Sequence, residues 1–274
     1  MVAGKDVCLR RLAGGMRARE VRFNRFLGNA KVTTTRIIES WSDGTVMAAE
    51  GRHVLAIQDT SEINFATKAQ NRRGLGEIGH GNTRGVLLHP MLAADAESGC
   101  CLGLLHGEIW TRQGRRTVSH DNRDLKDKES QRWIATALAA KPLLAKAAMV
   151  TMLGDRESDI FALYACAAEH QFHVIARSMH DRKLADGCGL YAASEAMTSI
   201  EQRTIVLPAR AQRPERAALL DLRFGAVELA RPQTKFLRHL PKSLPLILVD
   251  VREIEKMGRK AVDSNELFID GLPI

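Results

Sequence analysis

Two aspartates each close a short apolar run of the chain, a pattern typical of metal sites. Asp59 follows the run at 54–58, and Asp155 follows the run at 148–154. Both runs are short, aliphatic and bounded by polar residues, which favours buried strands over helices. Carboxylates at the ends of neighbouring strands can face one divalent cation, as in two-metal phosphoryl-transfer sites. A lone strand-end aspartate more often caps a helix or begins a turn, so the prediction depends on the pair.

The surrounding residues predict the elements that position this pair. Residues 1–50 read as helical, with Thr33, Thr34 or Thr35 able to cap a helix. Strands at 54–65, 84–95 and 100–112 are separated by turn-rich loops and predict an antiparallel meander. A helix is expected at 127–140, ended by Lys141 and Pro142. After the Asp155 strand we expect a helix capped by Ser158, and then a fifth strand at 172–177. This pattern alone indicates a mixed α/β fold.

Five segments in this order resemble a known family of DNA-processing enzymes. They are AIQDTS at 56–61, RGVLLH at 84–89, LGLLHGEIWTR at 102–112, DKESQRW at 127–133 and GDRESDI at 154–160. In order and spacing they resemble the DDE transposases of bacterial insertion sequences, in the IS-four-like, transposon-five-like branch. The resemblance extends from about Val21 to about Glu253.

The resemblance implies a fold, a division into domains and a cellular setting. The fold would be a ribonuclease-H-like mixed sheet, in which three antiparallel strands precede two that alternate with helices. A helical, DNA-binding-like region at 1–50 would precede the catalytic core at 51–183, followed by a β-rich insertion at 184–274. Asp250 also stands at a strand end, but it falls in the insertion and is expected to be structural. The partner would be double-stranded DNA at transposon ends, bound by a homodimer.

The implied chemistry is hydrolysis of a phosphodiester at the transposon end, followed by strand transfer. Asp59 and Asp155 would be catalytic and would bind metal, with two Mg²⁺ ions in a complete family member and Mn²⁺ as a possible substitute. Arg177 follows Asp155 by 22 residues and matches the family's phosphate-contacting arginine. An ion pair between Arg177 and Glu157 or Asp159 is the structural alternative.

The third carboxylate of the family is missing from this sequence. The family supplies it from a helix with the pattern Tyr, two residues, Arg, three residues, Glu, six residues, Lys. The only tyrosines are Tyr164 and Tyr191, which are followed three positions later by Ala167 and Ser194. The chain thus resembles a transposase truncated in the inserted domain, which predicts that it is inactive by itself. Two alternatives stay open: a nuclease of the same fold that uses Glu129 or Asp159 as third acid, and a non-catalytic DNA-binding fragment that interferes with a full-length transposase.

Basic residues are concentrated in three places, which favours a polyanionic partner. The net charge is +8 and the pI is near 9.5. Residues 1–26 carry seven basic against two acidic residues, and residues 203–242 carry nine against three. A glycine-punctuated loop between the first two strands contains Arg72 and Arg73 and ends at Arg84. We expect these arginines to contact DNA phosphates, with an affinity that falls steeply with salt.

Composition places the chain among ordinary globular proteins. Hydrophobic residues make up 45% and charged residues 26% of the 274 residues. The five cysteines form no zinc-ligand pattern, which favours a reducing compartment. The N-terminus lacks the apolar core of a secretory signal, and the apolar stretch at 134–153 is interrupted by Lys141, Pro142 and Lys146. We therefore expect a cytoplasmic protein without membrane contact.

Overall fold

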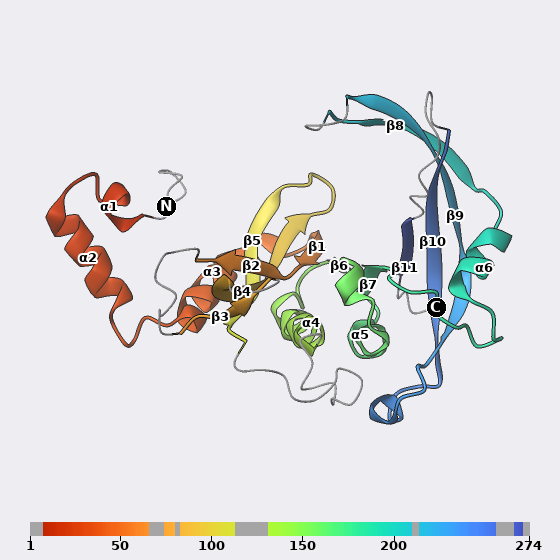
Figure 1. The fold of residues 1–274 in the computed structure, drawn as a ribbon, viewed down its shortest axis with the longest axis horizontal. Helices are drawn as coiled ribbons and strands as arrows, with labels where there is room; N and C mark the ends of the chain where they lie inside the picture. The colour runs from red at the N-terminus through yellow and green to blue at the C-terminus, as the bar shows by residue number, and fades with distance from the viewer. Residues whose placement is uncertain are drawn as a thin grey trace.

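One mixed β-sheet runs through this computed structural model, which describes residues 8–65, 74–79, 83–112, 131–209, 214–255 and 266–270 (Figure 1). Its strands are β1 (His53–Gln58), β2 (Ser61–Asn64), β3 (Gly76–Ile78), β4 (Thr83–Asp95), β5 (Cys101–Trp110), β6 (Met149–Gly154), β7 (Phe172–Arg177), β8 (Glu201–Leu207), β9 (Arg216–Ala230), β10 (Ser243–Glu255) and β11 (Glu266–Asp270). The predicted mixed α/β fold is therefore confirmed.

The described helices follow the sequence pattern closely at the N-terminus. They are α1 (Leu9–Leu12), α2 (Arg17–Leu27), α3 (Thr34–Ala49), α4 (Gln131–Leu143), α5 (Phe161–Ala167) and α6 (Leu190–Ala196), with 3₁₀ turns η3 (Arg156–Ser158) and η4 (Lys235–Leu237). Thr33 caps α3 by accepting a hydrogen bond from the Arg36 backbone N–H, at 3.2 Å. Helices α1 and α2 stand apart from the sheet at one end of the molecule (Figure 1). No helix in the described part of the chain is long and apolar enough to cross a membrane.

The central strands lie in the order β5-β4-β1-β6-β7. Strand β4 pairs antiparallel with β1 and β5, which forms the expected meander. Strand β6 pairs parallel with both β1 and β7, and a helix precedes each of β6 and β7 in the chain. The carboxyl ends of β1, β6 and β7 therefore meet at one edge of the sheet.

The expected strand at 54–65 is interrupted at Asp59. Strands β1 and β2 pair with β4 in the same register, which places Asp59 opposite Pro90 and Thr60 opposite His89. Proline has no backbone N–H to give to the ladder. The interruption thus coincides with the one residue of this part of β4 that cannot donate, and it leaves Asp59 outside the regular strand.

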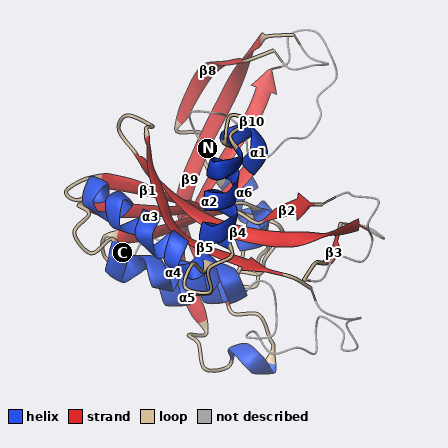
Figure 2. Cartoon of the chain, turned by 90° about the vertical axis from the view of Figure 1, so that its left-hand side faces the viewer, coloured by secondary structure: helices blue, strands red, loops and turns tan. Residues whose placement is uncertain are grey.

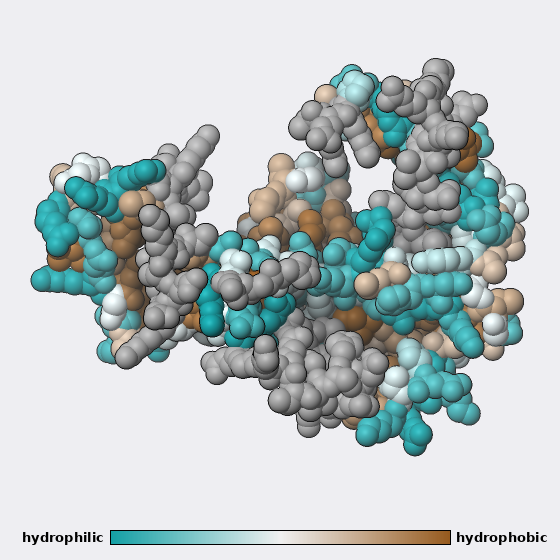
Figure 3. All heavy atoms as spheres, in the orientation of Figure 1, coloured by the Kyte–Doolittle hydropathy of each residue, from teal (hydrophilic) through white to brown (hydrophobic). Residues whose placement is uncertain are grey.

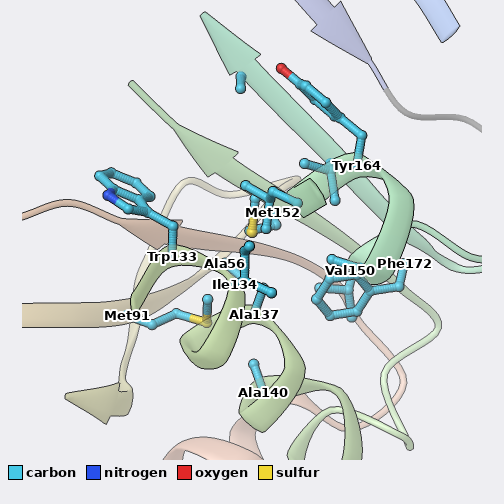
Figure 4. Packing of buried hydrophobic residues seen from close by; sticks show 14 of the residues in the cluster. Ala56, Met91, Trp133, Ile134, Ala137, Ala140, Val150, Met152, Tyr164 and Phe172 are labelled. Atoms are coloured by element: carbon cyan, nitrogen blue, oxygen red, sulfur yellow. The ribbon is translucent and has the colours of Figure 1, made fainter. Parts of the chain in front are cut away.

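The core lies on the face of the sheet that α3, α4 and α5 cover. Ala56 of β1, Val150 and Met152 of β6 pack against helix α4, which contributes Trp133 and Ala137 (Figure 4). In β1 the buried residues alternate with more exposed ones, as in a half-buried sheet, whereas in β6 Thr151 is buried as well. On the opposite face Ile57 and Leu92 remain 39% and 41% exposed.

The C-terminal strands are longer than the sequence suggested. The short apolar runs expected beyond residue 184 form β8, β9 and β10, three antiparallel strands that rise side by side (Figure 2). Strand β11 joins β10 to β7, so these strands continue the central sheet. Asp250 lies buried on β10, where its carboxylate accepts hydrogen bonds from Ser194 and from Arg252. These contacts give Asp250 a structural partner.

Two local predictions were wrong. Ser158 does not cap the helix after β6: α5 begins at Phe161 without a side-chain cap, and the Ser158 hydroxyl donates to the Asp155 carbonyl at 2.7 Å. Helix α4 does not end before Pro142 but includes it and ends at Leu143. All five cysteines are exposed.

Candidate active site

Asp59, Asp155 and Arg177 lie at the carboxyl ends of three adjacent parallel strands, at the same edge of the sheet. Ile57 pairs with Leu153, so the same register carried two residues further aligns Asp59 with Asp155. Gly154 pairs with Ala176, which aligns Asp155 with Arg177 one residue later. Asp155 keeps an extended backbone, with φ of −79° and ψ of −163°, so the strand alternation continues through it. The three side chains therefore belong to one row, on the face where Ile57 is exposed.

Each aspartate uses one carboxylate oxygen for a local hydrogen bond. Asp59 Oδ1 accepts from the Thr60 backbone N–H at 2.7 Å, and Asp155 Oδ1 accepts from the Glu157 backbone N–H at 2.8 Å. Both residues are exposed, and neither forms an ion pair within the described part of the chain. Two exposed carboxylates, each with an oxygen left for a ligand, form a donor set that suits a hard cation such as Mg²⁺. Asp155 also caps the η3 turn. It therefore has the structural role that a strand-end aspartate commonly has, in addition to the proposed role in metal binding.

A buried polar network lies directly behind Asp59. The His89 ring lies between the Thr60 hydroxyl, 2.8 Å from its Nδ1, and Gln58 Oε1, 3.1 Å from its Nε2. Gln58 Nε2 donates to the Trp133 carbonyl at 3.3 Å and contacts Met152 Sδ at 2.9 Å. Because the Gln58 amide donates in this way, its oxygen accepts from His89 Nε2–H, and His89 Nδ1 accepts from Thr60. The network thus fixes the residues on both sides of Asp59.

His89 is held neutral by its surroundings. Burial, with smaller contributions from Arg132 and His106, lowers the pKa of His89 from 6.5 to about 4. The His89 and Trp133 rings pack in a T-shaped arrangement, with ring centroids 4.7 Å apart. The sequence interpretation missed Gln58 and His89. Each is a polar residue at a core-facing position of an apolar strand. Burying such a residue costs free energy unless it is hydrogen-bonded, and this pattern could have revealed both.

Asp155 is positioned by a tight turn packed onto Gly154. Ser158 is fully buried, and its backbone N–H and hydroxyl both donate to the Asp155 carbonyl. A Cβ on Gly154 would lie 2.2 Å from Ser158 Oγ, 2.5 Å from Ser158 Cβ and 3.2 Å from the Trp133 ring. Only glycine lets the turn fold this close to the end of β6.

We expect Gly154→Ala to lower the free energy of unfolding by about 1–3 kcal/mol, as overpacking does, and to displace Asp155. Denaturant melts at constant m-value measure the loss. Because both close contacts are to the Ser158 side chain, the double variant Gly154→Ala/Ser158→Gly should recover most of the stability. No recovery in the double variant would place the cause elsewhere.

Asp159 ties the loop after β6 to the loop after β7. Its side chain is fully inaccessible, accepting from Arg182 Nε at 2.7 Å and from the Met179 backbone N–H at 2.9 Å. Arg182 also donates to the Asp159 carbonyl. Both carboxylate oxygens are therefore occupied, so Asp159 is not placed to serve as the third metal ligand. The same contacts hold the segment that follows Arg177.

The other predicted site residues are only partly described. Arg84 is exposed at the start of β4, opposite Glu77 of β3. Arg72, Arg73 and Glu129 lie outside the described residues. Within the described ranges, no group of three or more His, Cys, Asp or Glu side chains is arranged to hold a metal ion.

No protein-family model matches the chain. Among solved structures, the cryo-EM structure of the piggyBac transposase synaptic complex with hairpin DNA aligns with a TM-score of 0.37 and 8% sequence identity. The alignment covers 81% of this chain and 33% of that chain, so this chain spans about a third of the transposase's length. A likeness this distant establishes neither a shared fold nor a shared function.

Proposed function

We propose that this chain is a DNA-handling protein of the DDE transposase type, with Asp59 and Asp155 as metal ligands and Arg177 as a phosphate contact. The row formed by these three residues at the carboxyl ends of β1, β6 and β7 carries the proposal. Two further features support it: the five sequence segments that resemble the IS-four-like transposases, and the strand order β5-β4-β1-β6-β7, which is that expected for a ribonuclease-H-like core.

The residues of the row have separate tasks in this proposal. Asp59 and Asp155 would hold Mg²⁺, or Mn²⁺ in its place, through their open carboxylate oxygens. Such an ion, when bound, activates the attacking oxygen and stabilises the leaving one. Arg177 would hold the phosphate that is to be cut, because a guanidinium matches the geometry of phosphate oxygens. The Gln58, His89 and Thr60 network would keep Asp59 in place.

We further propose that the chain does not cut DNA by itself. The transposase chemistry needs three carboxylates, and the described residues bring only Asp59 and Asp155 into the row. Of the acids considered as substitutes, Asp159 is occupied by Arg182 and Met179. The second candidate function is a non-catalytic DNA-binding protein that interferes with a full-length transposase. The pairing of Asp159 favours it over a nuclease that would use Asp159 as its third acid.

Manganese binding tests the proposed metal site. Asp155→Asn should weaken Mn²⁺ binding by about tenfold or more, since it replaces a charged ligand with a neutral one, while the matched change Asp43→Asn, on the exposed side of α3, should leave it unchanged. Electron paramagnetic resonance of free Mn²⁺ measures both. Equal binding by the two variants would exclude the Asp59 and Asp155 pair as a metal site.

A cleavage assay separates the candidate functions. We expect no Mg²⁺-dependent cleavage or joining of transposon ends by this chain, and we expect activity when the third-carboxylate helix of an IS-four-like transposase is fused in frame. The fusion that carries Asp155→Ala is the control. Cleavage by the unmodified chain that Asp155→Ala abolishes would instead support a nuclease with a different third acid.

A further inference from the structure

Three of the nine basic residues at 203–242 form ion pairs with carboxylates, which makes them less available to a polyanion. Arg203 pairs with Glu201 at 3.0 Å, and Arg223 pairs with Asp221 at 2.8 Å. Arg216 meets Glu253 through two hydrogen bonds. Each of these guanidinium groups already has a carboxylate partner within the β8, β9 and β10 strands. The positive charge that stays available to a ligand lies elsewhere in the stretch.

Among the described basic residues of this stretch, those without a carboxylate partner lie in the connection between β9 and β10. Residues 231–242 contain four Lys or Arg residues, one His and no Asp or Glu. No described carboxylate forms an ion pair with Arg238 or Lys242. Figure 1 shows the connection extending from the lower end of the long strands, and Figure 3 shows hydrophilic side chains gathered there.

This connection surrounds an open cavity of about 570 Å³. Its polar lining includes Arg231, Gln233, Thr234, Arg238, Lys242 and Ser243, and no acidic residue lines it. Ser243, which lines the cavity, donates its hydroxyl hydrogen bond to the Glu228 carboxylate, which is not itself part of the lining. The cavity is thus cationic and lined with hydrogen-bond donors.

Arg231 gives the cavity a fixed shape. Its Nη1 donates to the carbonyls of Arg238, at 2.8 Å, and of Leu240, so one guanidinium ties both arms of the connection together. The Arg231 backbone N–H donates to the Lys242 carbonyl at 2.8 Å, which closes the hairpin. Arg238 and Lys242 are therefore held on a preformed loop, which lowers the entropy that a ligand must overcome.

We propose that this cavity binds phosphate groups of a polynucleotide backbone, at a second contact separate from the Asp59 and Asp155 row. Guanidinium, ammonium, hydroxyl and amide donors around one hollow are the groups that proteins use against phosphate and sugar oxygens. The cavity is much larger than a free phosphate ion, which favours a stretch of sugar-phosphate chain. This inference rests on the proposed DNA-handling function and adds the place where the chain holds its substrate.

Duplex binding by charge-reversal variants tests the inference. The probe is a short fluorescent DNA duplex, titrated from about 50 to 200 mM salt. Arg238→Glu should weaken binding by about tenfold at the lower salt and reduce the slope of log K against log salt by about one, as expected when a phosphate contact is lost. Lys146→Glu makes the same change in charge at an exposed site before β6 and should alter affinity by less than about twofold.

Each outcome supports or overturns phosphate binding at the cavity. Equal losses from Arg238→Glu and Lys146→Glu would show that only net charge matters and would overturn the inference. If Arg238→Glu lowers the melting temperature, the test uses Lys242→Ala instead, since no described acid pairs with Lys242. Inorganic phosphate is added in a parallel titration: displacement of the duplex by phosphate beyond that by chloride at equal ionic strength would assign the cavity to free phosphate instead.

The result is separable from the proposed function. Wild-type chain that binds the duplex with no dependence on Arg238 or Lys242 overturns the cavity and leaves the DNA-handling proposal in place. Wild-type chain that binds no duplex at low salt overturns both. Manganese binding at Asp59 and Asp155 is measured without DNA and is independent of either outcome.

Discussion

Replacing Asp159 with alanine is expected to lower the free energy of unfolding by about 3 kcal/mol, because it strands a partly buried charge and a backbone donor. The Arg182 guanidinium, 16% exposed, would lose its carboxylate partner, and the Met179 N–H would lose its acceptor. Equilibrium denaturation in urea measures the change. The loss should appear in the midpoint at constant m-value.

The double variant Asp159→Ala/Arg182→Met isolates the pair. If the cost of Asp159→Ala comes from the stranded charge, removing both partners should cost clearly less than the sum of the two single changes. Asp43→Ala on exposed α3 is the control and should stay within about 0.5 kcal/mol of wild type. Additive single effects would mean that the ion pair does not hold the two loops together.

Acidification from about pH 7 to about pH 4.5 is expected to cost about 2–3 kcal/mol of stability through His89 alone. The folded protein keeps His89 neutral down to a pKa of about 4, whereas the unfolded chain takes up a proton near 6.5. Between these values the unfolded state binds more protons, so stability falls as the pH falls. The contribution is complete above pH 6.5 and is lost progressively below it.

His89→Gln removes this titration while keeping an amide donor and acceptor in the network. Between the two pH values, the free energy of unfolding of His89→Gln should therefore fall by about 2–3 kcal/mol less than that of wild type. His180→Gln is the control, since His180 is exposed. Asp95 does not interfere, because the Ser98 backbone N–H and Arg52 lower its pKa to about 2. Parallel pH profiles of wild type and His89→Gln would contradict the role given to burial.

Periodicity in the sequence was enough to locate the strands that end at Asp59, Asp155 and Arg177. Short aliphatic runs with a period of two mark half-buried strands, and this signal is local. The N-cap of α3 was likewise predictable, because Thr33 needs only the backbone of its own first turn. The cap after β6 was assigned to Ser158, whereas Asp155 caps the η3 turn.

Contacts between distant residues were decided only by the tertiary structure. The alignment of Asp59 with Asp155 follows from the register of β1 against β6, and the burial of His89 follows from the packing of α4 on the sheet. Strand pairing also brought Arg216 of β9 to its carboxylate partner Glu253 on β10, whereas Arg203 and Arg223 pair with acids two residues away on their own strands. Sequence alone determined the candidate residues of the site, whereas their register and pairing depend on the interactions that fold the sheet.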